Sequence, residues 1–289
     1  MGITGQMGKE SRVSLEDLVV QEPEGERKQK AVEFFVEDEI DEEGWDGISE
    51  KYKGWVEDSR FVSSHPIAAA IFVAPDRVPD LDLSNKCTEI IASIDEFLEK
   101  EQTHEGQQYD ALRALQRSYE LKIIAPEKVT ELNLADKWER SYKAYHYHRS
   151  NGYWPQAIKA AFHLYALYPD RKSELELDRF WVHFRDSYEH CIELEEKRDG
   201  INLAVCLKVL YPEKVAELKL EDRWPEIKSV FDDDRDDKDW PRVIMQAMLL
   251  KILAAKKVNI SEGGIKVIMP TKEGYRSEIP PRPKRKETN

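Results

Sequence analysis

A period of 43 residues constrains this chain more than any other feature. The prolines Pro126, Pro169 and Pro212 follow one another at this interval. The same step relates further sets of identical residues: Leu132, Leu175 and Leu218; Leu134, Leu177 and Leu220; Trp138, Trp181 and Trp224. No insertion interrupts these positions, so the chain contains an internal repeat. A unit of this length buries its apolar face only by stacking on its neighbours.

The repeat extends in both directions from these three units. Residues 75–78 read Pro-Asp-Arg-Val and match the Pro-Glu-Lys-Val of residues 126–129 at an interval of 51 residues. Residues 255–258, Ala-Lys-Lys-Val, fall where the next such motif belongs. We therefore expect four units and a terminal half unit, at about 61–108, 109–154, 155–197, 198–240 and 241–269.

Each unit reads as two helices joined by a short helical turn. Apolar residues such as Ile158, Ala161 and Leu164 recur at helical spacing before the proline. The proline ends this helix and starts the next turn, and the acidic residue behind it complements the positive end of that turn. A second long helix then carries the tryptophan.

These units predict an all-α fold, an α-solenoid of about four and a half repeats over residues 61–269. The short turn between two long helices resembles HEAT and armadillo repeats, and the resemblance is one of architecture, from which no function is carried over. In the terminal half unit, residues 258–260 and 265–269 flank Gly263 and Gly264 and predict two short strands. We expect this β-hairpin to cap the last helix.

The chain of 289 residues holds 57 acidic and 44 basic residues, a net charge of −13, and the acid is concentrated near one end. Residues 1–60 hold 17 acids and 8 bases. Residues 1–30 have the composition of a flexible arm, whereas 31–60 mixes acids with aromatic residues and is expected to dock, either on the solenoid or on a partner. Residues 270–289 form a basic, proline-rich tail, expected to be extended and a candidate nuclear import signal in a eukaryote.

The composition excludes several function classes. A net charge of −13 argues against bulk binding to nucleic acids or anionic membranes. No apolar run approaches the roughly 20 residues of a membrane-spanning helix. Three scattered cysteines, Cys87, Cys191 and Cys206, predict no disulfide framework and favour a reducing, cytoplasmic location.

The sequence offers no motif for catalysis. None of the seven histidines stands in a zinc-binding spacing, so we expect no metal site. The acidic run at 232–239 lacks the Gly and Glu of a calcium-binding loop, and we expect a solvated loop between helices. There is no phosphate-binding loop or nucleophile motif, so we expect no cofactor, no small-molecule substrate and no enzymatic activity.

Two sets of repeated residues are candidates for binding. The tryptophans of the repeat could line a groove, but their place beside paired leucines predicts a packing role. A basic residue stands two positions after the first residue of each motif, and these five residues form what we call the basic ladder: Arg77, Lys128, Arg171, Lys214 and Lys257. The ladder could serve helix-end electrostatics, or it could receive an acidic segment of a partner or of residues 31–50.

We therefore expect a non-catalytic scaffold or adaptor that binds a protein partner. The alternative is a nucleic-acid- or ribonucleoprotein-associated helical repeat that uses the basic ladder as a local positive stripe. Salt distinguishes them, because binding to a polyanion weakens steeply as the salt concentration rises.

Overall fold

The structure of the protein is a computed structural model, and it describes residues 40–58, 64–79, 81–99, 104–132, 134–255, 257–261 and 264–268. The chain divides into two units, residues 1–30 and 31–289. All of the described residues belong to the second unit. The predictions for the arm at 1–30 and the tail at 270–289 lie outside them.

Helices dominate the described residues, so the all-α class is confirmed. The α-helices are α2 (Glu42–Glu57), α3 (His65–Val73), α4 (Ser84–Glu99), α5 (His104–Ile124), α6 (Leu134–Ser150), α7 (Trp154–Leu167), α8 (Leu177–Glu193), α9 (Lys197–Leu210), α10 (Leu220–Asp236) and α11 (Trp240–Ala254). Three 3-10 helices lie between them: η2 (Pro126–Leu132), η3 (Pro169–Leu175) and η4 (Pro212–Leu218). The strands β1 (Lys257–Ser261) and β2 (Gly264–Ile268) complete the set.

The three repeated prolines each begin a 3-10 helix that turns the chain from one long helix to the next. After η3 and η4, Glu176 and Lys219 both adopt left-handed backbone angles, with φ of 51° and 49°. Equivalent residues thus share an uncommon conformation without being glycine. Each of these residues lies between two leucines, Glu176 between Leu175 and Leu177 and Lys219 between Leu218 and Leu220. We call this connection between the 3-10 helix and the next outer helix the joint. Leu175 and Leu218 are buried in the core there.

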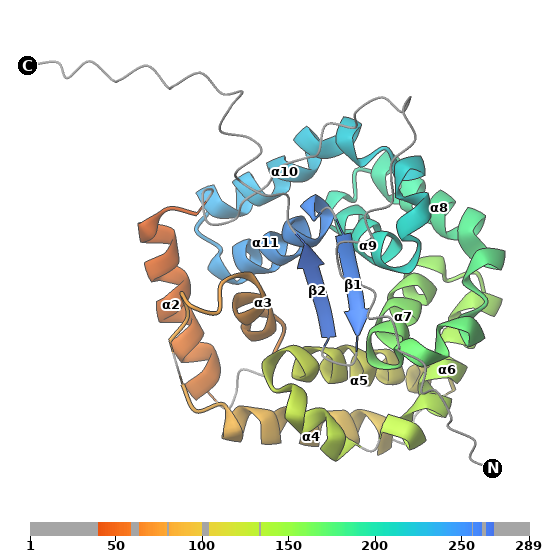
Figure 1. Cartoon of the computed structure of the whole chain (residues 1–289), viewed down its shortest axis with the longest axis horizontal. Coiled ribbons are helices and arrows are strands. Elements are labelled where there is room, and N and C mark those ends of the chain that lie inside the picture. Colours follow the sequence, from red (N-terminus) through yellow and green to blue (C-terminus); the bar gives the residue numbers. More distant parts are fainter. Residues whose placement is uncertain are drawn as a thin grey trace, which may run out of the picture. The chain divides into compact units, whose positions relative to one another are not determined.

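The helices form two concentric layers (Figure 1). The inner helices α3, α5, α7, α9 and α11 contact one another in this order, and α11 also contacts α3, so the inner layer closes into a ring. The outer helices α6, α8 and α10 each contact the inner helices on both sides in chain order, and α4 packs on α5. Within the described part of residues 40–255 the inner helices therefore close on themselves.

The closure depends on the N-terminal helix. The half unit at 241–269 contributes the inner helix α11 but no outer helix after it. Helix α2 takes that place, because it contacts both α11 and α3. Residues 42–57 of the acidic 31–60 segment thus belong to the ring, and we call the junction of α2 with α10, α11 and α3 the seam.

The sequence of α2 explains why it fits between α11 and α3. Trp45, Ile48 and Tyr52 recur at helical spacing and are buried. Asp41 caps the helix by accepting a hydrogen bond from the backbone N–H of Gly44, at 2.8 Å. On the opposite side, Gly47 lets the helix approach α11 closely, since an added Cβ would lie 2.5 Å from the indole nitrogen of Trp240.

Four outer helices share a buried position seven residues after their tryptophan, which is Trp45, Trp138, Trp181 or Trp224. Tyr52, Tyr145, Tyr188 and Phe231 occupy it in α2, α6, α8 and α10, and none is more than 2% exposed. The hydroxyl of Tyr145 donates to the carbonyl oxygen of Leu175 at 2.8 Å. A buried tyrosine can thus fill the core and satisfy its polar end at the joint.

The acidic run at 232–239 is more helical than the sequence predicted. Helix α10 continues to Asp236, and only residues 237–239 connect it to α11. Lys228 lies one turn before Asp232 and Arg235 lies three residues after it, and both bases pair with its carboxylate. The solvated loop is therefore shorter than predicted, because bases within the run offset the repulsion between its carboxylates.

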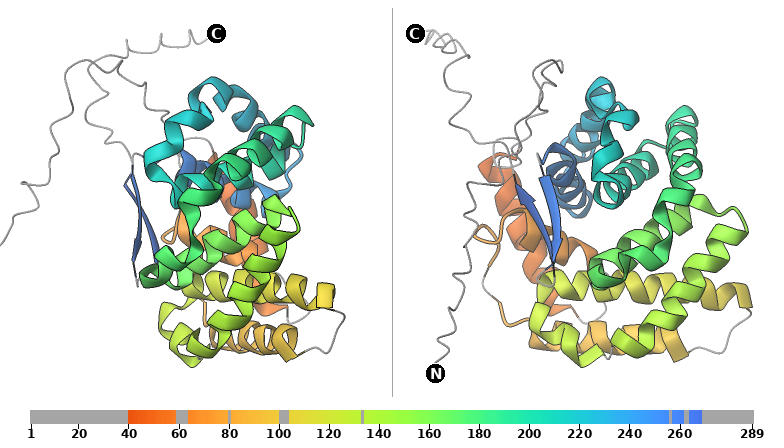
Figure 2. Two further views of the ribbon diagram at one scale, coloured as in Figure 1. Left: turned by 90° about the vertical axis from the view of Figure 1, so that its right-hand side faces the viewer. Right: turned by 45° about the vertical axis from the view of Figure 1, so that its right-hand side comes forward.

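The hairpin follows directly from α11. Strands β1 and β2 pair antiparallel, with Lys257 opposite Ile268 and Ser261 opposite Gly264. The hairpin contacts α7 and α9 and lies at one face of the helical ring, as the turned views show (Figure 2).

Candidate functional site

The basic ladder lies along the joints between units. Arg171, on η3, places its guanidinium 4.0 Å from the ring centre of Trp138 on the preceding outer helix. The same guanidinium forms a bidentate ion pair with the carboxylate of Glu174, with N–O distances of 2.6 and 2.8 Å. This side chain therefore combines a cation–π contact with a local ion pair.

Two further members repeat this arrangement. Lys214, on η4, lies 5.5 Å from the ring centre of Trp181 and 3.4 Å from a carboxylate oxygen of Asp178. Arg77 lies 5.9 Å from the ring centre of Trp45, in α2, and 2.9 Å from a carboxylate oxygen of Glu42. Helix α2 thus presents a tryptophan to the ladder as the repeat helices do.

The remaining two members differ. Lys128 pairs with Glu131 at 2.7 Å, and Cys87 stands where the neighbouring unit has Trp138. The side chain of Lys257, on β1, lies outside the described part of the chain. Lys128 and Arg171 thus pair with acids of their own 3-10 helices, whereas Arg77 and Lys214 pair with acids of other helices, Glu42 of α2 and Asp178 of α8. Glu42 belongs to the acidic segment at 31–50, and docking of an acidic segment along the whole ladder stays a prediction.

The repeated tryptophans lie in the core, as predicted, although not equally. Trp138 and Trp181 are buried, and Trp224 is half-buried. The indole N–H of Trp181 donates to Glu217 at 2.9 Å. Trp138 and Trp181 also contact the ladder residues Arg171 and Lys214.

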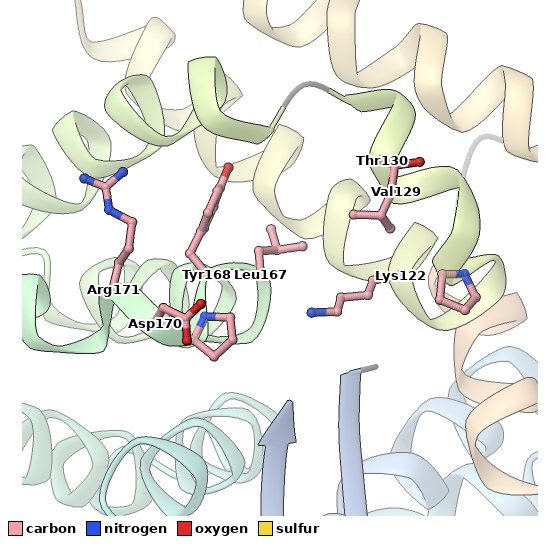
Figure 3. Close-up of a pocket in the computed structure, with 9 residues that line it drawn as sticks. Lys122, Val129, Thr130, Leu167, Tyr168, Asp170 and Arg171 are labelled. Atoms are coloured by element: carbon pink, nitrogen blue, oxygen red, sulfur yellow. The ribbon is translucent and has the colours of Figure 1, made fainter. Parts of the chain in front are cut away.

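A cavity of about 340 Å³ lies between η2 and η3, beside the ladder. Val129 and Thr130 lie on one side and Leu167 and Tyr168 on the other, and Lys122 extends from α5 into the space between them (Figure 3). The complete lining is Lys122, Pro126, Val129, Thr130, Leu167, Tyr168, Pro169, Asp170 and Arg171.

Lys122 belongs to a set of lysines that cap the inner helices. Lys122, Lys208 and Lys251 occupy one repeat position, and each donates to carbonyl oxygens at the end of the neighbouring inner helix. The oxygens belong to Ala166 for Lys122 (2.9 Å), to Leu253 and Ala255 (2.7 Å) for Lys208, and to Val73 for Lys251 (2.7 Å). A cation at the negative end of a helix is favourable, so these lysines bind neighbouring inner helices together.

The environment of Lys208 shows that this role is structural. Burial lowers the pKa of its amine to about 8. The amine nevertheless donates to two main-chain carbonyls, whose partial charges partly replace the lost water.

A second polar group lies inside the ring at Glu120, whose side chain is fully buried. Its carboxylate accepts hydrogen bonds from Gln116 (2.8 Å) and Arg117 (2.9 Å) of α5 and from Ser64, and it pairs with His65 Nδ1 at 3.0 Å. Burial alone would raise the pKa of this carboxyl, but the hydrogen bonds and charges of His65 and Arg117 lower it to about 2. The group ties the start of α3 to α5.

Glu120 shares its repeat position with His163 and Cys206 on the next two inner helices. Burial lowers the pKa of His163 to about 3 and raises the pKa of the Cys206 thiol to about 12. At neutral pH the imidazole is therefore uncharged and the thiol protonated. Cys206 lacks the low pKa of a nucleophilic cysteine.

The seam brings together two acidic runs that are about 190 residues apart in sequence. Lys238 Nζ lies 2.6 Å from Glu43 Oε1 across it. A cleft of about 280 Å³ opens there between the start of α2 and the end of α10. It is lined by Ile40, Asp41, Glu43, Gly44, Arg235, Asp236, Lys238 and Trp240, and we call it the seam cleft.

Charge differs between the two helical layers. The five outer helices hold 22 acids against 12 bases, and the five inner helices hold 4 acids against 9 bases. Helix α10 is the most acidic, with seven acids and three bases, and α6 is the one outer helix with a basic excess. The negative charge of these helices is therefore carried by the outer layer.

We also searched the described residues for metal sites, disulfides and membrane-spanning helices. These residues contain no group of three or more His, Cys, Asp or Glu side chains that could hold a metal ion. The three cysteines are buried, and none forms a disulfide. Among the same residues, no helix combines the length and apolar character needed to cross a membrane.

Comparisons with known proteins give the chain no relative. No family model matches it, no curated protein matches its sequence, and no solved structure matches its fold.

Proposed function

We propose that the protein is a non-catalytic binding module whose acidic outer layer engages a basic protein partner. The observation that carries this proposal is the opposite sign of the two layers, with the acidic excess on the helices that face outward. Such a surface attracts a basic partner over a distance and speeds its association.

The arrangement of the ring supports this surface as the binding element. A closed ring lacks the continuous concave face that an open solenoid offers to a partner. We propose that the ring consists of five helix pairs, with α2 completing the fifth, and that the β1–β2 hairpin caps one face. Most of the remaining accessible surface then belongs to the outer helices.

Charge reversal on the outer layer tests the proposal. Glu50, Glu226 and Asp233 are exposed on α2 and α10. We expect Glu50→Lys/Glu226→Lys/Asp233→Lys to release proteins of high isoelectric point that the unaltered full chain retains at low salt, as detected by affinity purification and mass spectrometry. The proposal is wrong if the retained proteins are the same for both chains.

The control is the reversal of the ladder, Lys128→Glu/Arg171→Glu/Lys214→Glu. It changes three charges in the opposite sense, and we expect it to leave the basic partners bound. Loss of bound nucleic acid on this second variant would instead support the alternative, a nucleic-acid-associated protein that uses the ladder.

A further inference from the structure

The seam cleft combines an apolar floor with an acidic rim. The half-buried Trp240 supplies apolar surface, Ile40 lies almost fully buried in the lining, and Asp41, Glu43 and Asp236 supply carboxylates. The two bases that line it are already engaged, because Arg235 lies 3.2 Å from Asp232 and 3.6 Å from Asp236, and Lys238 lies 2.6 Å from Glu43. With three carboxylates against two bases, the lining keeps a negative excess.

Several carboxylates near the cleft lie on the surface. Glu42, Asp46, Asp233 and Asp237 are exposed on the same helix ends. Because like charges repel at this density, a positively charged ligand would stabilise the junction. No group in the described residues is compact enough for a metal ion, so the charge pattern fits an extended basic segment.

We propose that the basic, proline-rich segment at residues 280–286 of this same chain docks in the seam cleft. Its sequence is Pro-Pro-Arg-Pro-Lys-Arg-Lys. Prolines favour the extended polyproline II conformation, which aromatic grooves recognise at low entropic cost. The prolines pack on Trp240 while Lys284, Arg285 and Lys286 meet the acidic rim.

The chain is long enough for this contact. Ile268 lies opposite Lys257 in the hairpin, and so close to the end of α11. Trp240 begins α11, whose 15 residues span about 22 Å. The residues between Ile268 and Pro280 can extend over about 40 Å, which covers that length and the short step from the hairpin.

A peptide titration on the full chain tests the contact. The probe is a synthetic peptide of residues 276–289, and the receptor is the full chain with its own tail reversed, Lys284→Glu/Arg285→Glu/Lys286→Glu. We expect this receptor to bind the peptide, and the unaltered chain to bind it at least tenfold more weakly, because a tethered tail competes at a high effective concentration. Calorimetry at low salt measures both dissociation constants.

Two matched receptor variants locate the site. Asp236→Lys/Asp237→Lys reverses two exposed acids beside the cleft, at the end of α10, where lysine also suits the helix dipole and preserves folding. Glu193→Lys/Glu195→Lys makes the same charge change at the end of α8. We expect the first pair, added to the tail-reversed chain, to weaken peptide binding at least tenfold, and the second to change it less than twofold.

Three outcomes would overturn the proposal. Equal weakening by both pairs would show that only bulk charge attracts the peptide. Equal peptide binding by the unaltered and tail-reversed chains would show that the cleft is open to a partner's segment and not held by the tail. Absence of peptide binding to the tail-reversed chain would remove the site altogether. Because the contact is within one chain, it goes beyond the proposed function, and the capture of basic partners is measured independently of it.

Discussion

The repeat joints and the seam hold an outer helix in the same way with different sequences. At the joint of α6 with η3, Trp138 lies under Arg171 and the two segments belong to the repeat. At the seam, Trp45 lies under Arg77, yet α2 lies outside the repeat that we read from the sequence. The seam also depends on contacts that the repeat joints lack, such as Gly47 against Trp240 and Lys238 with Glu43.

The comparison teaches that ring closure needs only the contact surface of an outer helix. Both sites have a tryptophan, a buried residue seven positions later and a base that covers the ring. The rest of the repeat, including the proline and its 3-10 helix, connects each inner helix to the next outer helix. A helix supplied from the far end of the chain therefore replaces a repeat helix.

The largest expected effect tests whether the two kinds of joint are equally strong. Truncation of Trp181 to Ala should lower the free energy of unfolding by about 3–5 kcal/mol, the usual result for a buried tryptophan. Trp45→Ala should fall at the lower end of this range, because the indole nitrogen of Trp45 finds no hydrogen-bond partner among the described residues whereas that of Trp181 donates to Glu217. Urea denaturation measures both. A loss below about 1 kcal/mol for Trp45→Ala would show that α2 contributes little to the ring.

A glycine pair within α2 sharpens the view of the seam. Gly47→Ala should destabilise the protein by about 1–3 kcal/mol, because the new Cβ overpacks against Trp240. Gly54→Ala should stabilise it by about 0.5–1 kcal/mol, since a Cβ there meets no atom within 4 Å and alanine favours the helix. Thermal melting of both variants provides the comparison. If both changes act in the same direction, close approach to Trp240 does not limit the seam.

Acid should weaken the repeat interior before it affects the Glu120 group. Burial holds the folded-state pKa of His163 at about 3, below the usual 6.5 of the unfolded chain, so stability falls as pH drops below about 6.5. The expected loss is about 1.4 kcal/mol per pH unit at most. Glu120 has a folded-state pKa of about 2, so its contribution is lost only below about pH 4.3.

Urea midpoints between pH 7 and 4.5 measure this dependence, and His163→Leu is the test variant. It should flatten the profile, with the remaining slope due to His146 and His148, whose pKa values burial also lowers. An unchanged slope in His163→Leu would remove His163 as the cause.

The smallest effect separates ladder members with and without an aromatic ring. Arg171→Gln should cost about 0.5–1 kcal/mol, because it removes the cation–π contact with Trp138. Lys128→Gln should cost close to zero, since it removes only an exposed ion pair with Glu131. Equal costs in urea denaturation would mean that the tryptophan ring does not support the ladder.

The sequence predicted the repeated parts of this fold because a repeat shows the same physical requirement several times. Pro169 and Pro212 mark the starts of 3-10 helices, and Trp138 and Trp181 mark the buried faces of outer helices. A single position would have been ambiguous, but its recurrence at one interval identified its role.

The closure and the interior polar groups could not be read from the repeat. Contact between α2 and α11 depends on the angle by which each unit is rotated relative to the one before it. No single residue or motif in the sequence indicates that angle. One signal was available, because Trp45 precedes Pro75 by 30 residues, close to the 31 residues between Trp138 and Pro169. Similarly, Glu120 stands out as a charged residue at a buried repeat position, but two of its partners, Ser64 and His65, come from a segment about 55 residues away.

The place of α2 in the ring has a consequence for biosynthesis. This helix leaves the ribosome first among the described helices, yet one of the two helices that receive it ends at Ala254. At about 5–20 residues per second, the roughly 200 residues between them take about 10–40 s to make. During that interval the apolar face of Trp45, Ile48 and Tyr52 has no completed site. The nascent chain therefore holds this apolar face without its site on α11 until translation of the described helices is finished.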